Sequence, residues 1–126
     1  MILLDMKDRR PLYEQIIDRF EELIFRKILE PESKLPSVRA LAIDLSINPN
    51  TIQRAYSELE RLGYIHSIKG KGNFVSDVKH LLPARQTEFF ITLDTVLERS
   101  KDVSLGADEV LLHVKDYYNK GETLHD

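Results

Sequence analysis

The sequence contains no cysteine, and only five glycines and five prolines among its 126 residues. The lack of cysteine excludes disulfide bonds and thiolate metal sites. No apolar run is long enough to cross a membrane, and the first residues lack the basic flank and the apolar stretch of a signal peptide. We therefore expect a cytoplasmic protein with no membrane segment.

No set of residues has the spacing of a catalytic or metal-binding site. The histidines at positions 66, 80, 113 and 125 are scattered, and no histidine or acid pair recurs at metal-ligand spacing. The glycine-rich turn at 69–72 lies in a hairpin pattern, which is the wrong context for a nucleotide phosphate. We predict no enzyme activity, no cofactor and no metal.

An excess of basic charge is also missing, since the net charge is −3. Residues 1–80 hold 13 Lys or Arg against 12 Asp or Glu, whereas residues 81–126 hold 5 against 9. With 42% hydrophobic and 31% charged residues, the chain can form a core and should be soluble. We expect a compact domain over residues 1–78 and a small helical domain over residues 79–126.

Residues 35–63 contain two short helical patterns separated by a polar joint. Ser37 is a good N-cap for the first pattern, and Asn48 is a good N-cap for the second. Pro49 suits a first helical position, and Gly63 suits the end of a helix that reaches about Leu62. This layout predicts a helix-turn-helix, whose second helix enters a DNA major groove.

Polar side chains cluster at the N-terminal end of the second helix, namely Asn48, Asn50, Thr51, Gln53 and Arg54. Asn and Gln can hydrogen-bond adenine, Arg can hydrogen-bond guanine, and Thr can contact a phosphate or a thymine methyl group. The helix N-terminus itself favours a phosphate. The alternative is a solvated helix face with ordinary capping. The neighbouring helix and the hairpin that follows favour a DNA-binding face.

A β-hairpin is predicted from residues 64–68 and 73–75, with a turn between them. The turn contains Lys69, Gly70 and Lys71, which could lie against a phosphate backbone or enter a minor groove. A solubilising turn is the alternative. Next to a helix-turn-helix, the hairpin is expected to act as a wing.

Arg39 is expected in the first turn of the first of these helices, where a cation is mildly unfavourable unless a partner compensates. A DNA phosphate or a guanine edge is one candidate partner. Asp44 is the other.

In order and spacing, these motifs resemble the DNA-binding domain of the GntR family of bacterial transcription regulators. The resemblance is carried by residues 11–16, 35–42, 48–56, 59–63 and 70–75. It implies a winged helix that binds operator DNA as a homodimer. It also implies DNA contacts by Ser37, Arg39, Asn50, Thr51, Gln53, Arg54, Lys69 and Gly70. The NPNTIQRAY form and the short tail resemble the YtrA subfamily, although Ser46 stands where the family often has glycine.

Helical patterns also flank this region. Residues 11–28 predict a core-forming helix, and residues 84–100 and 107–119 predict two C-terminal helices. Two helices cannot cover all the apolar side chains of the C-terminal pair, so we expect a dimer interface. Its residues would be Phe89, Phe90, Leu93, Val96, Leu97, Val110, Leu111, Val114, Tyr117 and Tyr118. The alternative is that the pair folds back onto its own winged helix.

The fold expected is mainly α with a small β-hairpin: a winged helix-turn-helix domain plus a short two-helix dimerisation domain. The function expected is a homodimeric, sequence-specific repressor that binds a pseudo-palindromic operator. The subfamily resemblance implies a transporter operon as its target. A winged-helix protein–protein interaction module is the alternative. The small-molecule effector, if there is one, is unknown.

Overall fold

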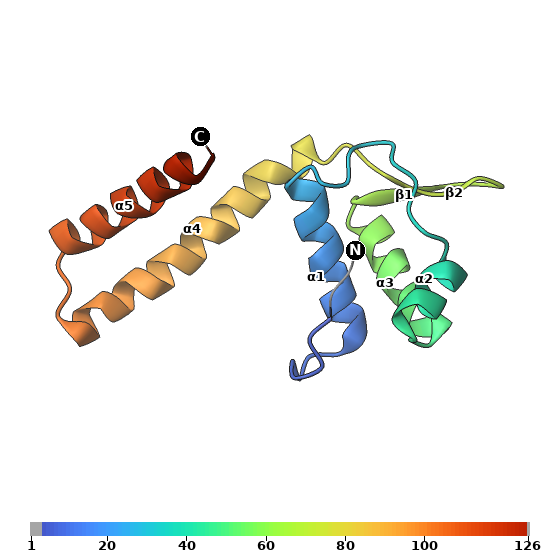
Figure 1. Cartoon of the computed structure of the whole chain (residues 1–126), viewed down its shortest axis with the longest axis horizontal. Helices are drawn as coiled ribbons and strands as arrows, with labels where there is room; N and C mark the ends of the chain where they lie inside the picture. Colours follow the sequence, from blue (N-terminus) through green and yellow to red (C-terminus); the bar gives the residue numbers. More distant parts are fainter. Residues whose placement is uncertain (1–3, 126) are drawn as a thin grey trace. The chain divides into compact units, whose positions relative to one another are not determined.

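The structure is a computed structural model that describes residues 4–125, with the side chains of residues 4–121. The chain divides into two compact units, Met1–Leu81 and Leu82–Asp126. In the first unit lie α1 (Leu12–Phe25), α2 (Val38–Leu45), α3 (Pro49–Arg61), β1 (Ile65–Ile68), β2 (Gly72–Val75) and the 3-10 turn η1 (Lys79–Leu81) (Figure 1). The second unit holds α4 (Leu82–Glu98), the 3-10 segment η2 (Arg99–Val103) and α5 (Ala107–His125). This is the predicted fold class.

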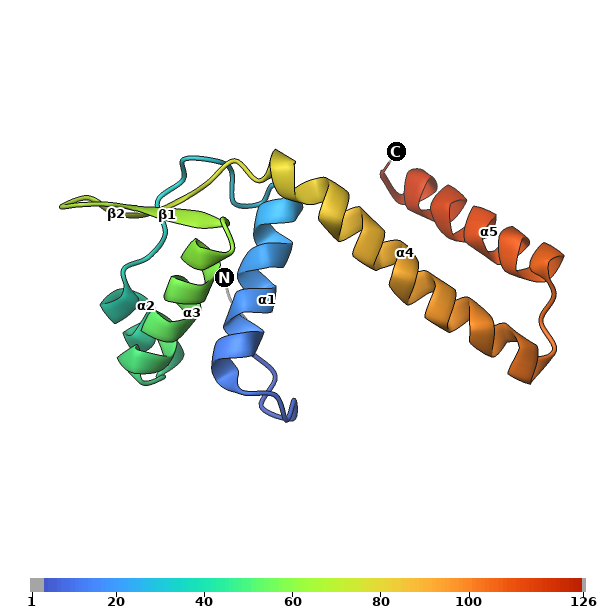
Figure 2. The same ribbon diagram turned by 180° about the vertical axis from the view of Figure 1, so that it is seen from behind.

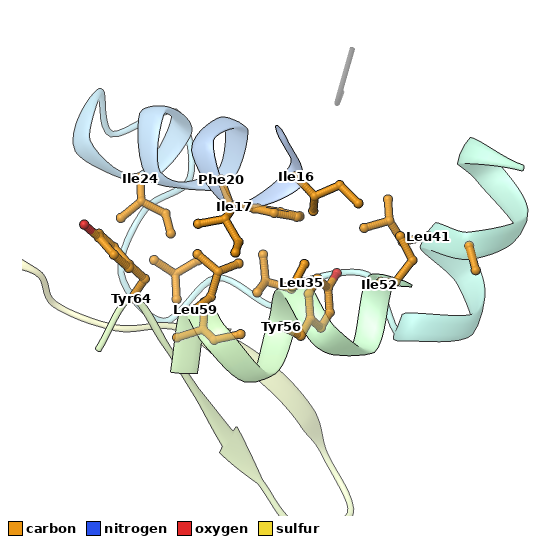
Figure 3. Close-up of a cluster of buried hydrophobic side chains, with 14 residues drawn as sticks. Ile16, Ile17, Phe20, Ile24, Leu35, Leu41, Ile52, Tyr56, Leu59 and Tyr64 are labelled. Carbon is orange, nitrogen blue, oxygen red and sulfur yellow. The ribbon is translucent and has the colours of Figure 1, made fainter. Parts of the chain in front are cut away.

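The core of the first unit lies between α1 and α3. The apolar residues of α3 recur every three or four positions, so they share one face. Figure 3 shows this face packed against α1 and against the segment that precedes α2. The side chains that α3 buries are Ile52, Ala55, Tyr56 and Leu59, each at most 2% exposed. This packing fixes which side of α3 faces outward.

Tyr56 joins α3 to the start of α2. Its hydroxyl donates a hydrogen bond of 2.7 Å to the carbonyl oxygen of Pro36, directly before α2. Its ring meets Phe20 of α1 edge to face, with centroids 5.7 Å apart. Tyr56 therefore connects three parts of the unit with one buried side chain. Burial also raises the pKa of the Tyr56 phenol well above its ordinary value of 10.0.

The end of α1 differs from the prediction, which extended this helix to about Ile28. The helix ends at Phe25, and Lys27 adopts a left-handed conformation with φ of 60°. The Ile28 N–H then donates to the Leu23 carbonyl, which completes a common helix-ending motif. Ile28 is consequently 63% exposed rather than buried. Glu21 of α1 is buried.

The hairpin formed by β1 and β2 is antiparallel, with Ile65 opposite Val75 and Ile68 opposite Gly72. A third segment, residues 32–35, also pairs with β2, and no local sequence pattern predicts this pairing. The Glu32 N–H donates to the Val75 carbonyl, and the Leu35 N–H donates to the Asn73 carbonyl. The hairpin is thereby attached to the chain that enters α2.

The second unit consists of two antiparallel helices joined by η2 and a short loop (Figure 2). Both helices are longer than predicted. α4 begins at Leu82, because Pro83 in its first turn needs no N–H partner. α5 continues through Gly121 to His125 instead of ending near Asn119. None of the residues 82–121 is buried, so the pair has no interior of its own.

None of the described helices combines the length and the apolar composition needed to span a membrane.

Replacing Tyr56 with Phe tests its link to Pro36. We expect the free energy of unfolding to fall by about 1 kcal/mol at pH 7, because a hydrogen bond is lost and the Pro36 carbonyl loses its partner. Because burial raises the folded-state pKa, Tyr56 stabilises the native state below pH 10.0, and this contribution declines as the pH rises further. Tyr56→Phe should therefore lose less stability than the wild type between pH 7 and about pH 11. Urea unfolding measures both effects, and parallel pH profiles would contradict this assignment.

Candidate nucleic-acid interface

Helices α2 and α3 each begin with a side chain that caps the helix N-terminus. The Ser37 hydroxyl accepts a hydrogen bond of 3.0 Å from the Ala40 N–H at the start of α2. The Asn48 side chain accepts one of 2.8 Å from the Asn50 N–H at the start of α3. Between the two helices, Ser46 takes a left-handed conformation with φ of 55°. A serine thus performs here the role for which glycine is commonly used.

The outward side of α3 carries most of the polar residues predicted to contact DNA. Asn50, Gln53 and Arg54 are exposed, whereas Thr51 is half-buried at the flank of the helix. The Gln53 amide donates to the Ser57 hydroxyl at 3.1 Å. Ser57 lies one turn further along α3, so this hydrogen bond holds the Gln53 side chain along the helix surface.

Asn48 and Ser37 are exposed too, but their side-chain oxygens already act as helix caps. Asn48 keeps its amide N–H groups for an outside partner, and Ser37 keeps its hydroxyl hydrogen. Any contact that they make with DNA is therefore additional to a structural role.

Arg39 is exposed in the first turn of α2. Within the described residues it forms no ion pair with Asp44, the partner that the sequence offered within the chain. The guanidinium therefore projects into solvent next to the start of a helix, where an anion would be favoured by both groups.

Arg54 has a neighbour that sequence reasoning missed. Its guanidinium carbon lies 3.7 Å from the ring centroid of Tyr13 in α1, well within the range of a cation–π contact. Tyr13 is half-buried, and its place in the sequence indicates only membership of the predicted core-forming helix. No sequence signal could have found this pair, because the two residues are 41 positions apart and belong to separate helices.

The turn between β1 and β2 carries the predicted wing residues. Lys69, Gly70 and Lys71 are all exposed, and Gly70 has φ of 78°. The turn is closed by a hydrogen bond of 2.9 Å from the Lys71 N–H to the Ile68 carbonyl. In both overall views the hairpin projects on the same side of α3 as α2 does (Figures 1 and 2).

A third lysine lies beside this turn. The Cε atom of Lys34 is 3.2 Å from the position that a Cβ atom on Gly72 would occupy, and Gly72 has φ of 118°. Only glycine combines this backbone conformation with space for the lysine chain. The pairing of residues 32–35 with β2 brings Lys34 here, so its position could not be read from its place in a loop.

Two acidic residues on the C-terminal half of α3 are held by partners. Glu58 is paired with Arg61, whose hydrogen bond lowers the pKa of the Glu58 carboxyl. Glu60 accepts a hydrogen bond of 3.0 Å from Ser67 of β1. These contacts partly neutralise the negative charge at this end, while the N-terminal half of α3 presents uncharged polar groups and one cation, Arg54.

The arrangement can bind an extended polyanion. A capped helix exposes amide side chains, and cations lie on it and beside it: Arg54 on α3 against Tyr13, Arg39 on α2, and the lysines of the hairpin. Among residues 4–121, no three His, Asp or Glu side chains gather closely enough to bind a metal ion.

Comparison with known proteins agrees with this geometry. The family model described as bacterial regulatory proteins, gntR family, matches residues 12–75, which extend from α1 to β2. The chain belongs to the GntR family. It is similar to the HTH-type transcriptional repressor YtrA of Bacillus subtilis, with 47% identity over 77 residues. That match covers 61% of this chain and 59% of the repressor.

Two solved structures extend the comparison. A transcriptional regulator from Oenococcus oeni aligns over 94% of this chain and 99% of its own, with a TM-score of 0.76 and 28% identity. The DNA-binding domain of AraR, solved in complex with its operator ORR3, aligns over 59% of this chain and 89% of its own. Its TM-score is 0.52 and its identity 26%.

These comparisons confirm the predicted family and its YtrA-like subfamily. This GntR chain is a transcriptional regulator and not an enzyme.

Replacing Asn48 with Ala should separate helix capping from DNA contact. We expect Asn48→Ala to lower the free energy of unfolding by about 1 kcal/mol, because the Asn50 N–H loses its acceptor. Asn50→Ala is the matched control, since the Asn50 side chain is exposed, and it should change stability by less than about 0.5 kcal/mol. Chemical denaturation measures both. Equal losses in the two variants would show that the cap does not stabilise α3.

Proposed function

We propose that this chain is a homodimeric, sequence-specific repressor that binds a pseudo-palindromic operator. The observation that carries the proposal is the capped helix α3, whose buried face leaves Asn50, Gln53 and Arg54 exposed on its outer side. The likeness to a domain solved on its operator supports DNA as the ligand. The subfamily resemblance alone supports a transporter operon as the target.

The residues divide by the partner that their chemistry suits. Asn50 and Gln53 read base edges, with Asn48 and Thr51 beside them, because amides form paired hydrogen bonds with adenine. Ser37 and Arg39 bind phosphates at the start of α2. Lys69, Gly70 and Lys71 place the hairpin against the sugar–phosphate backbone, joined by Lys34. Arg54 lies beside Asn50 and Gln53, with its guanidinium against Tyr13.

The net charge supports a division between base reading and phosphate attraction. Residues 1–80 carry a net charge of only +1, so attraction to DNA depends on where the cations lie. Phosphate contacts position a protein on DNA, whereas base contacts specify the sequence. A small number of phosphate contacts also predicts modest non-specific affinity.

The second unit supplies the dimer in this proposal. Phe89, Phe90, Leu111 and Tyr117 are 57–70% exposed, an amount of apolar surface that a monomer rarely leaves in water. An apolar groove near the joint of the two helices is lined mainly by Val96, Leu97, Val103, Leu105, Val110 and Val114. A two-fold partner would fill this groove and cover these side chains, together with Leu93 and Tyr118. Two heads would then read two half-sites.

Base reading and phosphate binding give different results when mutated. Gln53→Ala should relax base preference at one position of the bound sequence, whereas Lys69→Ala should weaken binding to all sequences alike. Each loss should be about 1–3 kcal/mol at most, and Lys69→Ala should also reduce the salt slope by about one. Competition binding over a range of salt concentrations measures both effects. Lys115→Ala, in the second unit, is the control for loss of a lysine.

If neither substitution changes retention on the protein's own upstream DNA, the proposal fails. A winged-helix module for protein–protein interaction then becomes the better account.

A single charge in the groove should break the proposed dimer. Val114→Glu places a carboxylate among apolar side chains in a unit that is already acidic, so desolvation and repulsion both oppose association. At micromolar concentration, light scattering should give twice the 14.7 kDa chain mass for the wild type and the chain mass for this variant. Lys115→Gln, an exposed neighbour with the same charge change, should remain dimeric. A monomeric wild type would contradict the proposal.

A further inference from the structure

Tyr13 is placed where a side chain of α1 can act on the DNA-binding face. It lies in the first turn of α1, and its ring covers the guanidinium of Arg54 on α3. The two helices pack against each other one and two turns further along α1, through Ile16 and Phe20, which are fully buried. The ring therefore has a fixed position relative to α3.

The stacked geometry leaves the hydrogen-bonding capacity of Arg54 intact. A guanidinium is planar, and its five N–H groups point outward in that plane. Tyr13 occupies the flat face, so the N–H edge is still available. In the described part of the chain, no hydrogen bond or ion pair takes up that edge, although the charge of Arg54 also acts on Glu58 one turn away.

We propose that Tyr13 is a positioning residue that holds Arg54 ready to bind a DNA phosphate. The inference rests on the proposed function. A free arginine loses rotamer freedom when it binds, whereas a stacked one has already lost most of it. The contact with Tyr13 draws the guanidinium toward α1 and away from the centre of the outward side of α3, so it suits the backbone at the edge of a groove better than a base inside it. Arg54 would therefore add affinity for every sequence rather than preference for one.

A double-mutant cycle on the full-length chain tests this role. The variants are Tyr13→Leu, Arg54→Gln and the two combined, with Tyr13→Phe as the control that keeps the ring. Dissociation constants are measured for a specific and an unrelated duplex over a range of salt concentrations. Tyr13→Leu should weaken binding to both duplexes by about two- to tenfold. It should have no effect when Arg54 is already Gln, and Tyr13→Phe should bind like the wild type.

A merely structural role for Tyr13 would give a different pattern. If Tyr13→Leu weakens DNA binding equally whether residue 54 is Arg or Gln, the proposal is overturned. It is also overturned if Tyr13→Leu weakens binding to the specific duplex alone. Wild-type protein that binds neither duplex would overturn the proposed function and this inference together. Binding by the wild type with no effect of Tyr13→Leu would overturn this inference alone.

A measurement without DNA keeps the proposal testable if Tyr13→Leu does not fold. In the free protein, the NMR signals of the Arg54 side-chain protons should be shifted upfield by the Tyr13 ring. The shift should persist in Tyr13→Phe. Signals at ordinary positions in the wild type would show that Arg54 is not held before DNA arrives, and the proposal would be wrong.

Discussion

The burial of one face of α3 determines how the rest of the first unit is arranged. Ile52, Tyr56 and Leu59 are almost completely removed from water, and rotating α3 would expose them at a cost of about 1.5–3 kcal/mol each. The helix therefore has one orientation, and its opposite side is polar because it is not needed for the core. Tyr56 extends the constraint by holding Pro36, from which α2 begins. Core packing, rather than any feature of the exposed side chains, therefore determines which side of α3 faces outward.

The second unit follows a different rule. Its helices are amphipathic in composition but bury no residue among positions 82–121, so they lack the interior that makes a domain stable by itself. A symmetric partner would complete that interior and would also place two copies of α3 on one duplex. Dimerisation would thus both bury the apolar side chains of the second unit and provide the two copies of α3 that a two-fold operator requires. The acidic charge of residues 81–126 also suits a part of the chain that does not contact DNA.

Much of the first unit could be predicted because its signals are local. Ser37, Asn48 and Pro49 indicate where helices begin, and the glycines around Lys71 indicate a turn. The predictions failed where segments distant in the sequence come into contact, and where a helix ends without the glycine that usually marks its end. Lys27 ends α1 in a conformation that normally indicates glycine. Lys34 reaches the hairpin, and Tyr13 reaches Arg54, only because packing brings their segments together.

Selection of genomic DNA fragments by the purified protein, followed by sequencing, decides whether two copies of α3 bind paired half-sites. We expect one enriched motif with two-fold symmetry, whose half-sites are centred about 10 base pairs apart or a multiple of that distance. Its half-sites should contain adenines that the amides of α3 can read. An enriched motif without symmetry would contradict binding by the two DNA-binding domains of a symmetric dimer. Fragments without any common sequence would contradict base recognition by α3 itself.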